Sequence, residues 1–301
     1  MKVGFVVLLS DDRAAGPGSA ARYAKIRDRA KRAEDAGYDS IWLYDHLMYR
    51  PDETDWTVGI WEAWTMMSAL AEATERVEIG SLVLCNQFRN PAILAKMAHT
   101  LDEVSGGRLI LGIGAGWNRA EFDAFGMPFD HRVARLEEAL QIIRPLLKEG
   151  RVDFEGEYYR ARDCEITPRS PRPDGPPLMV AALGAKTIRL AVAYADQWNT
   201  AYWATPEDSA PQIELFDEAV AEVRPERVPD KTILAAVAFD DLLPDGHGFA
   251  SAINGEPDDI AAALAAHAEA GITHLQLHVV PYSDEAITRT EAGLEAWRRS
   301  G

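Results

Sequence analysis

The stretch RVEIGSLVLCNQFRNPAILAKMAHTLDEVSGGRLILGIGAGWN, residues 76–118, already predicts the fold. Residues 76–85 and 108–116 are largely apolar, which is typical of buried parallel strands. Between them, residues 91–104 begin with Pro and carry apolar side chains at helical spacing. A strand, a helix and a strand in this order indicate a βαβ unit with two parallel strands.

The same alternation runs through the rest of the chain. Further strand-like runs lie at residues 3–9, 40–46, 178–182, 197–202, 232–239 and 274–280. Helical patterns separate them, and the clearest has Leu136, Leu140, Ile143 and Leu147 on one stripe. Eight strand and helix units predict a single (β/α)8 TIM barrel over residues 1–301. Residues 154–177 are polar and Pro-rich, so we expect an insertion with a short hairpin over one end of the barrel.

Composition excludes several classes of function. The chain has 31 Lys and Arg against 48 Asp and Glu, and its net charge of −17 disfavours a nucleic-acid partner. The first residues read as a strand and not as a secretory signal, and no apolar run is long enough for a membrane span. Only two cysteines, Cys85 and Cys164, occur far apart, which favours a cytoplasmic protein without disulfides.

Chemistry in such a barrel is expected where the strands end, at their carboxyl termini. Asp45 and His46 end the second predicted strand, and a His can exchange protons near neutral pH. A purely structural role for His46 stays open. Aromatic residues around this strand end could stack a flat ring or could pack in the core: Trp42, Tyr44 and Tyr49.

Two glycine-containing turns are candidate ligand sites. GIGAGWN, residues 112–118, would let a ligand approach the backbone, although a simple turn explains it equally well and the spacing differs from a dinucleotide fingerprint. ALGAKTIRL, residues 182–190, starts a helix with Lys186, which suits a phosphate or is a solvated lysine. A metal site at His274 and His278 is disfavoured because no acidic cluster accompanies them.

Four stretches together resemble the luciferase-like monooxygenase superfamily, and more closely its branch that depends on coenzyme F420: AEDAGYDSIWLYDHL, residues 75–126, RLEEALQIIRPLL and YADQWN. The resemblance implies a TIM barrel with an insertion segment, usually a homodimer. It also implies that a flavin-like ring lies across the mouth of the barrel.

The resemblance assigns roles to particular residues. His46 would stand near the reactive carbon of the ring, with Asp45 beside it in the coenzyme pocket. A bulge at residues 80–82, often with a non-proline cis peptide, would back the ring. The implied cofactor-binding residues are Asp45, Ser81, Leu82, Asn86, Gly114, Ala115 and Asn118, with Ala181, Ala182, Gly184 and Lys186 around the phosphate.

Two positions depart from the family pattern. Trp117 stands where the sugar-phosphate dehydrogenases of the family carry a catalytic Glu, which argues against a glucose-6-phosphate mechanism. Leu183 occupies a loop in which relatives commonly show paired glycines. The main hypothesis is an F420-dependent oxidoreductase that transfers a hydride to or from an organic substrate. An FMN-dependent monooxygenase using O2, a non-catalytic flavin-binding barrel and a metal-dependent hydrolase are the alternatives.

Overall fold

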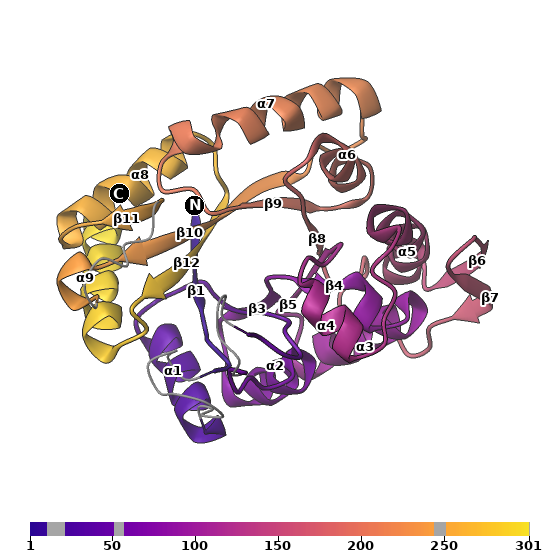
Figure 1. The fold of residues 1–301 in the computed structure, drawn as a ribbon, viewed down its shortest axis with the longest axis horizontal. Helices are drawn as coiled ribbons and strands as arrows, with labels where there is room; N and C mark the ends of the chain where they lie inside the picture. Colours follow the sequence, from indigo (N-terminus) through magenta and orange to yellow (C-terminus); the bar gives the residue numbers. More distant parts are fainter. Residues whose placement is uncertain (11–21, 51–56, 244–250, 301) are drawn as a thin grey trace.

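Eight parallel strands close into a barrel, which confirms the predicted (β/α)8 fold (Figure 1). The computed structural model describes residues 1–10, 22–50, 57–243 and 251–300. Each strand of the barrel pairs with the next, and the last pairs with the first. In order around the barrel they are β1 (Lys2–Val6), β2 (Ser40–Leu43), β3 (Glu78–Ser81), β5 (Leu109–Gly114), β8 (Leu178–Ala181), β9 (Gln197–Ala201), β10 (Asp230–Ala238) and β12 (His274–Val280).

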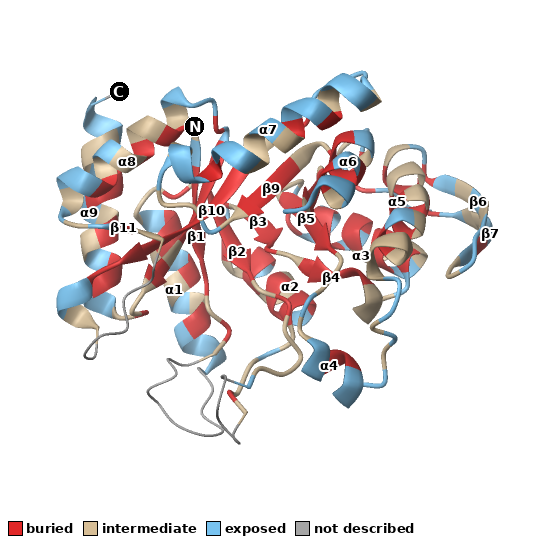
Figure 2. Ribbon diagram, turned by 45° about the horizontal axis from the view of Figure 1, so that its top comes forward, coloured by how far each residue is buried: buried red, intermediate tan, exposed pale blue. Residues whose placement is uncertain are grey.

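Helices surround the barrel and bury their apolar sides against it (Figure 2). The stripe predicted from the sequence is buried as expected on the longest of these helices before the insertion, α5. No helix in the described ranges combines the length and the hydropathy that a membrane span needs. The helices are α1 (Tyr23–Asp35), α2 (Ala63–Ala73), α3 (Pro91–Val104), α4 (Arg119–Ala124), α5 (Arg132–Lys148), α6 (Ala185–Tyr194), α7 (Pro206–Val223), α8 (Pro257–Glu269) and α9 (Asp284–Ser300), with short 3-10 turns η2 (Asn86–Phe88) and η3 (Asp240–Leu242).

The inside of the barrel is filled by side chains. Trp42 is fully buried there, and a Cβ on Gly80 would lie only 2.1 Å from its Cζ3 atom. The indole Nε1 donates to the Ser40 hydroxyl at 2.7 Å, which in turn lies 2.7 Å from His274 Nε2. Burial lowers the pKa of His274 to about 3. Because this interior is packed, a ligand has to bind at an end of the barrel, as in other barrels of this kind.

The third predicted strand is interrupted, which differs from the continuous run expected at residues 76–85. β3 ends at Ser81, and a second short strand, β4 (Leu84–Cys85), resumes the pairing with β5. Between these pairings the chain advances from Gly80 to Leu84 while β5 advances only from Ile110 to Ile113, so one extra residue forms a bulge. The expected non-proline cis peptide is present but joins Leu82 to Val83, at the end of the stretch assigned to it.

The insertion forms a hairpin of β6 (Arg151–Glu155) and β7 (Arg160–Glu165), which confirms the predicted hairpin. The two strands lie beside α5 at the periphery (Figures 1 and 2), and Tyr159 in their turn reaches Asn86 at the carboxyl end of the barrel. The carboxylate of Glu138 on α5 holds its turn by accepting from the main-chain N–H groups of Glu157, Tyr158 and Tyr159. A further short strand, β11 (Ala252–Asn254), extends the sheet beside β10 and was not predicted.

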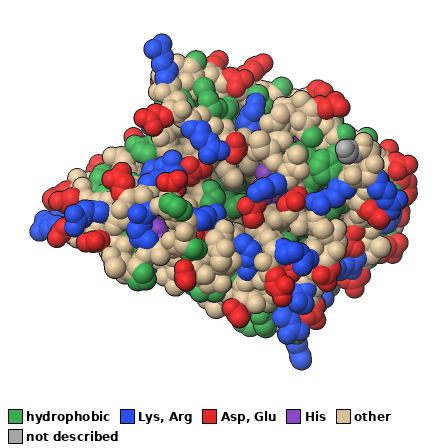
Figure 3. Space-filling model, turned by 180° about the vertical axis from the view of Figure 1, so that it is seen from behind, with side chains coloured by type: hydrophobic (Ala, Val, Ile, Leu, Met, Phe, Trp, Pro, Cys, Tyr) green, Lys and Arg blue, Asp and Glu red, His purple; other side chains and the backbone are tan. Residues whose placement is uncertain are grey.

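Acidic and basic side chains are interspersed over the face drawn in Figure 3. Exposed ion pairs among the described residues include Arg151 with Glu165 and Arg189 with Glu222.

Candidate active site

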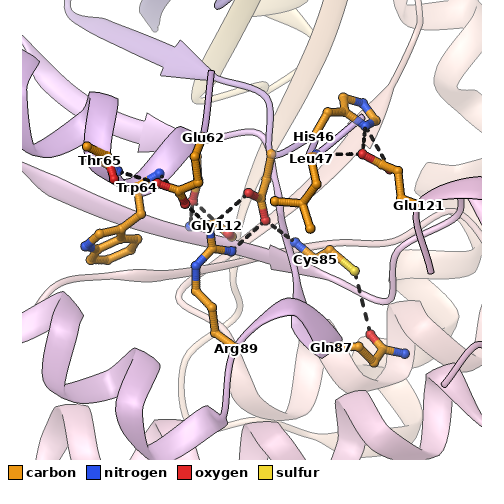
Figure 4. Close-up of polar contacts among 12 residues, drawn as sticks. His46, Leu47, Glu62, Trp64, Thr65, Cys85, Gln87, Arg89, Gly112 and Glu121 are labelled. Atoms are coloured by element: carbon orange, nitrogen blue, oxygen red, sulfur yellow. Dashed lines mark hydrogen bonds and ion pairs between the residues drawn. The ribbon is translucent and has the colours of Figure 1, made fainter. Parts of the chain in front are cut away.

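The segments that follow β2, β4 and β5 meet at the carboxyl end of the barrel and bring His46 against Glu121. Glu121 lies on α4 and is only 2% exposed. Its carboxylate oxygens lie 3.1 and 3.2 Å from Nδ1 of His46 (Figure 4). The same carboxylate accepts hydrogen bonds from the main-chain N–H groups of Leu47 at 2.7 Å and of Met48 at 3.0 Å. The imidazole of His46 is therefore held from one side by a buried acid.

Aromatic rings complete the surroundings of His46. The rings of Trp117 and Tyr49 both have centroids 5.8 Å from the imidazole, and Trp117 meets it edge to face. Trp117 is 66% exposed, so its indole is available to a ligand. Asn118 donates from its amide to the carbonyl of Met48 at 3.3 Å. These contacts join the loop after β2 to the glycine-containing turn after β5.

Asp45, the neighbour of His46 in the sequence, is bonded within the protein. Its side chain has no exposed surface, and it accepts from the main-chain N–H of Cys85 and from Arg89. Arg89 also pairs with Glu62, the residue that caps α2. Burial opposes the charge of Arg89, yet the bonds to Asp45 and Glu62 hold its pKa above the usual value. The carboxylate of Asp45 is thus occupied by the protein and supports the site from behind.

The bulge between β3 and β4 lies next to the turn after β5. Ser81 faces β5, because its hydroxyl donates to the Gly112 carbonyl at 2.7 Å, and Leu82 packs in the barrel interior. A Cβ on Gly114 would lie 2.9 Å from Val83 Cγ2 and 3.8 Å from the carbonyl oxygen of Ala181. The missing side chain at Gly114 therefore lets the bulge, β5 and β8 approach one another, and the partly buried Ala115 continues this turn.

Asn86 is fully buried just after β4. Its amide Nδ2 donates to the Tyr159 hydroxyl at 3.2 Å, so the turn of the hairpin reaches the site. Its Oδ1 has no hydrogen-bond partner among the described residues. A buried polar atom without a partner is rare and indicates that a donor belongs there.

The predicted phosphate residues lie at the start of α6, beside Ala181 at the end of β8. Ala182 is buried and hydrogen-bonds through its main chain to Asn199 and Trp198. Gly184 is the N-cap of α6 without a side-chain cap, and none of the described atoms lies within 4 Å of a Cβ built on it. Lys186 and Leu183 are exposed on the same turn. This end of α6 is open, with its first main-chain N–H groups available.

Glu121 and Arg89 were missed by the sequence analysis. Glu121 follows the glycine-containing turn by only a few residues, in RAEFDAFG, and its position between apolar neighbours Ala120 and Phe122 is the signal that could have found it. Arg89 lies in NQFRN, a polar stretch without periodicity, and nothing there indicates that its side chain turns toward Asp45.

A second cluster at the mouth was also missed. The Tyr44 hydroxyl lies 3.1 Å from His278 Nδ1 and 3.3 Å from the Tyr202 hydroxyl. Burial raises the pKa of Tyr44 well above its usual value. His274 lies at the other end of the same strand and is bonded to Ser40, so the two histidines of β12 serve different clusters.

The fold and the site together define a TIM-barrel enzyme with a partly buried His and a glycine-containing turn at the carboxyl end of the barrel. Residues 1–242 match the family described as luciferase-like monooxygenase. The chain belongs to this family.

Two curated relatives carry the name F420-dependent glucose-6-phosphate dehydrogenase. The protein from Amycolatopsis mediterranei is 38% identical over 169 residues, which cover 54% of this chain and 48% of that protein. The protein from Kineococcus radiotolerans is 30% identical over 314 residues, which cover 87% of this chain and 88% of that protein. The chain therefore spans about half of the first relative and most of the second.

A solved structure described as an F420-dependent secondary alcohol dehydrogenase in complex with an F420-acetone adduct has the same fold. Its TM-score is 0.79 at 22% identity, and the match covers 99% of both chains. At this level of identity the likeness supports the barrel architecture alone.

Proposed function

We propose that this protein is an oxidoreductase that uses coenzyme F420 to transfer a hydride to or from a small organic substrate. The observation that carries the proposal is the meeting of His46, the bulge at Leu82 and Val83, and the turn of residues 112–118 at one end of the barrel. Coenzyme F420 is named for the relatives described above, which supports this choice of cofactor.

The residues present fit such a coenzyme. Asn86 offers a buried carbonyl oxygen without a partner, which suits a ring N–H donor. Gly114 and Ala115 present main chain and small side chains, against which a flat ring can lie. The open start of α6 with Lys186 suits a phosphate, because helix N-termini carry exposed N–H groups and partial positive charge.

When bound, a deazaflavin supplies a ring carbon that takes up or releases a hydride. The protein has to place the substrate carbon over that ring and to move a proton. His46 is the group that we assign to the proton, because its imidazole lies at the mouth and is only partly buried. General acid or base catalysis of this kind contributes roughly 10²- to 10⁴-fold in rate.

We propose an apolar or planar substrate without a sugar phosphate. The exposed indole of Trp117, beside His46, stands at the position that the family resemblance gives to a catalytic Glu. An exposed aromatic face favours a ligand that can stack on it. We therefore do not propose glucose 6-phosphate, which the relatives' name gives, as the substrate of this protein.

The alternative cofactor is FMN, with O2 as the co-substrate, and the description of the family as monooxygenases supports it. Titration of the purified chain with F420 and with FMN, followed by tryptophan fluorescence, separates the two. Binding of F420 in preference to FMN, and reduction of F420 on addition of substrate, would support the proposal. Preference for FMN would refute it, and binding of F420 without turnover of a broad alcohol and amine panel would favour a non-catalytic barrel.

The oligomeric state and the compartment stay predictions. We propose a cytoplasmic homodimer, and light scattering coupled to size exclusion would measure the mass of the assembly.

A further inference from the structure

The carboxylate of Glu121 is the hydrogen-bond partner of His46 among the described residues. Both hydrogen bonds between the imidazole and the described residues are made by Nδ1, and both go to the Glu121 carboxylate. The acid is fully enclosed, and its Oε1 is also reached by the N–H groups of Leu47 and Met48. These contacts fix the orientation of the carboxylate independently of the imidazole.

The donors around the carboxylate determine which nitrogen of His46 carries the proton. A main-chain N–H can only donate, so Oε1 has to accept. An ionised carboxylate has only acceptors to offer, and a neutral imidazole carries its proton on one of its two nitrogens. With an ionised carboxylate, Nδ1 is the protonated nitrogen of the neutral ring, which leaves the lone pair on Nε2.

We propose that Glu121 is a positioning residue that holds neutral His46 as the Nδ1–H tautomer, so that Nε2 is the nitrogen that accepts the substrate's proton. This inference rests on the proposed function. In the oxidative direction a substrate O–H or N–H bond breaks and its proton passes to Nε2. The adjacent C–H bond breaks with its electron pair, the hydride passes to the oxidised coenzyme, and a C=O or C=N bond forms. The imidazolium then faces the Glu121 carboxylate, which stabilises its charge.

A structural role for Glu121 is the rival explanation, because the same carboxylate fixes the main chain at Leu47 and Met48. Glu121→Gln separates the two roles. The Gln Oε1 can still accept from both main-chain N–H groups, and its NH2 then points at Nδ1 of His46. In this variant Nδ1 has to become an acceptor, so the proton moves to Nε2.

Nitrogen-15 NMR of the full-length chain labelled at histidine, without added coenzyme, reads the tautomer directly. His46→Gln assigns the signals, and the spectra are recorded at a pH where the ring is neutral. We expect the Nδ1–H form in the wild-type protein and the Nε2–H form in Glu121→Gln. Asp123→Asn, which changes an exposed acid on the same helix that pairs with Arg119, should keep the Nδ1–H form. An Nε2–H form in the wild type, or an unchanged tautomer in Glu121→Gln, would overturn the proposal.

Activity gives the second readout. We expect Glu121→Gln to lower kcat about 10²-fold while the Kd of F420 changes less than about threefold, and Asp123→Asn to stay within about twofold of the wild type. If Glu121→Gln instead weakens F420 binding and lowers the free energy of unfolding along with kcat, the role of Glu121 is structural. If His46→Gln keeps full activity or F420 does not bind, the proposed function fails, whereas the tautomer measured in the coenzyme-free protein still decides the role of Glu121 at His46.

Discussion

Arg89 forms a two-point ion pair with Asp45, from Nη1 to Oδ2 at 2.8 Å and from Nη2 to Oδ1 at 3.1 Å. The side chain of Asp45 has no exposed surface and that of Arg89 is 11% exposed. Asp45 directly precedes His46, and Arg89 also reaches Glu62 at the start of α2. This pair therefore ties three segments together just behind the proposed catalytic His.

Removal of the cation should leave a buried negative charge without its partner. We expect Arg89→Met to lower the free energy of unfolding by about 3–5 kcal/mol, the cost typical of breaking a buried ion pair. Urea denaturation followed by circular dichroism measures it. Arg151→Met removes the exposed pair with Glu165 and should cost less than about 1 kcal/mol. Equal effects of the two substitutions would contradict the structural role given to Arg89.

Gly80 is required by the indole of Trp42. We expect Gly80→Ala to destabilise the protein by about 1–3 kcal/mol, because a methyl group there overlaps the buried ring and the packed barrel has no room to move it. Gly184→Ala adds the same atom in open space and should change the unfolding free energy by less than about 1 kcal/mol. Thermal melting of both variants provides the comparison, and a Gly80→Ala protein as stable as the wild type would show that the interior is looser than described.

His274 makes stability depend on pH. Burial, with smaller contributions from Lys2 and the N-terminus, lowers its pKa to about 3, whereas the pKa of an unfolded His is about 6.5. Below about pH 6.5 the His in the unfolded chain binds a proton, whereas His274 in the folded chain does not. The free energy of unfolding therefore decreases as the pH falls from about 6.5 to about 3. From this residue alone we expect about 2 kcal/mol less stability at pH of about 5 than at pH of about 7.5.

The variant His274→Asn should flatten this pH dependence, measured as the free energy of unfolding in urea at each pH. His131→Asn replaces an exposed His and should leave the slope unchanged. An equally steep slope in His274→Asn would assign the acid sensitivity to other groups.

Asn86 should matter for the coenzyme more than for the fold. If its unpartnered Oδ1 accepts from the coenzyme, Asn86→Leu loses one hydrogen bond, worth about 1 kcal/mol, and the Kd of F420 rises roughly 5- to 10-fold. Calorimetric titration measures the Kd. Tyr159→Phe removes the protein partner of the amide but keeps Oδ1, so it should change the Kd less. An unaltered Kd in Asn86→Leu would place Asn86 outside the binding site.

The sequence predicted the barrel because alternating strand and helix patterns are local signals. The stripe of Leu136, Leu140, Ile143 and Leu147 needs no knowledge of distant residues, and all four side chains are buried. The break after Ser81 could not be predicted from the run itself, since residues 76–85 are apolar on both sides of it. The family resemblance implied a bulge at residues 80–82, and the register against β5 locates the extra residue between Gly80 and Leu84.

The charged residues that contact the candidate site, Glu121 and Arg89, were harder to predict from the sequence than His46. His46 is marked by its place at a strand end, which is a property of the fold class. Glu121 and Arg89 act through side chains that cross from one segment to another, and the partners of a buried charge depend on tertiary packing. For the same reason the ion pair of Asp45 with Arg89 could not be predicted from the sequence, whereas the role of Asp45 in the coenzyme pocket stays a prediction.

The extra residue between Gly80 and Leu84 also changes the parity of the strand. Side chains alternate between the two faces of a strand, so one added residue exchanges inward and outward positions for everything that follows. Deletion of Val83 would restore an even ladder in which Leu84 still lies opposite Ile113 and Cys85 opposite Gly114. Because of this extra residue, one apolar run supplies both a strand of the barrel, β3, and the short strand β4 that leads to the candidate site.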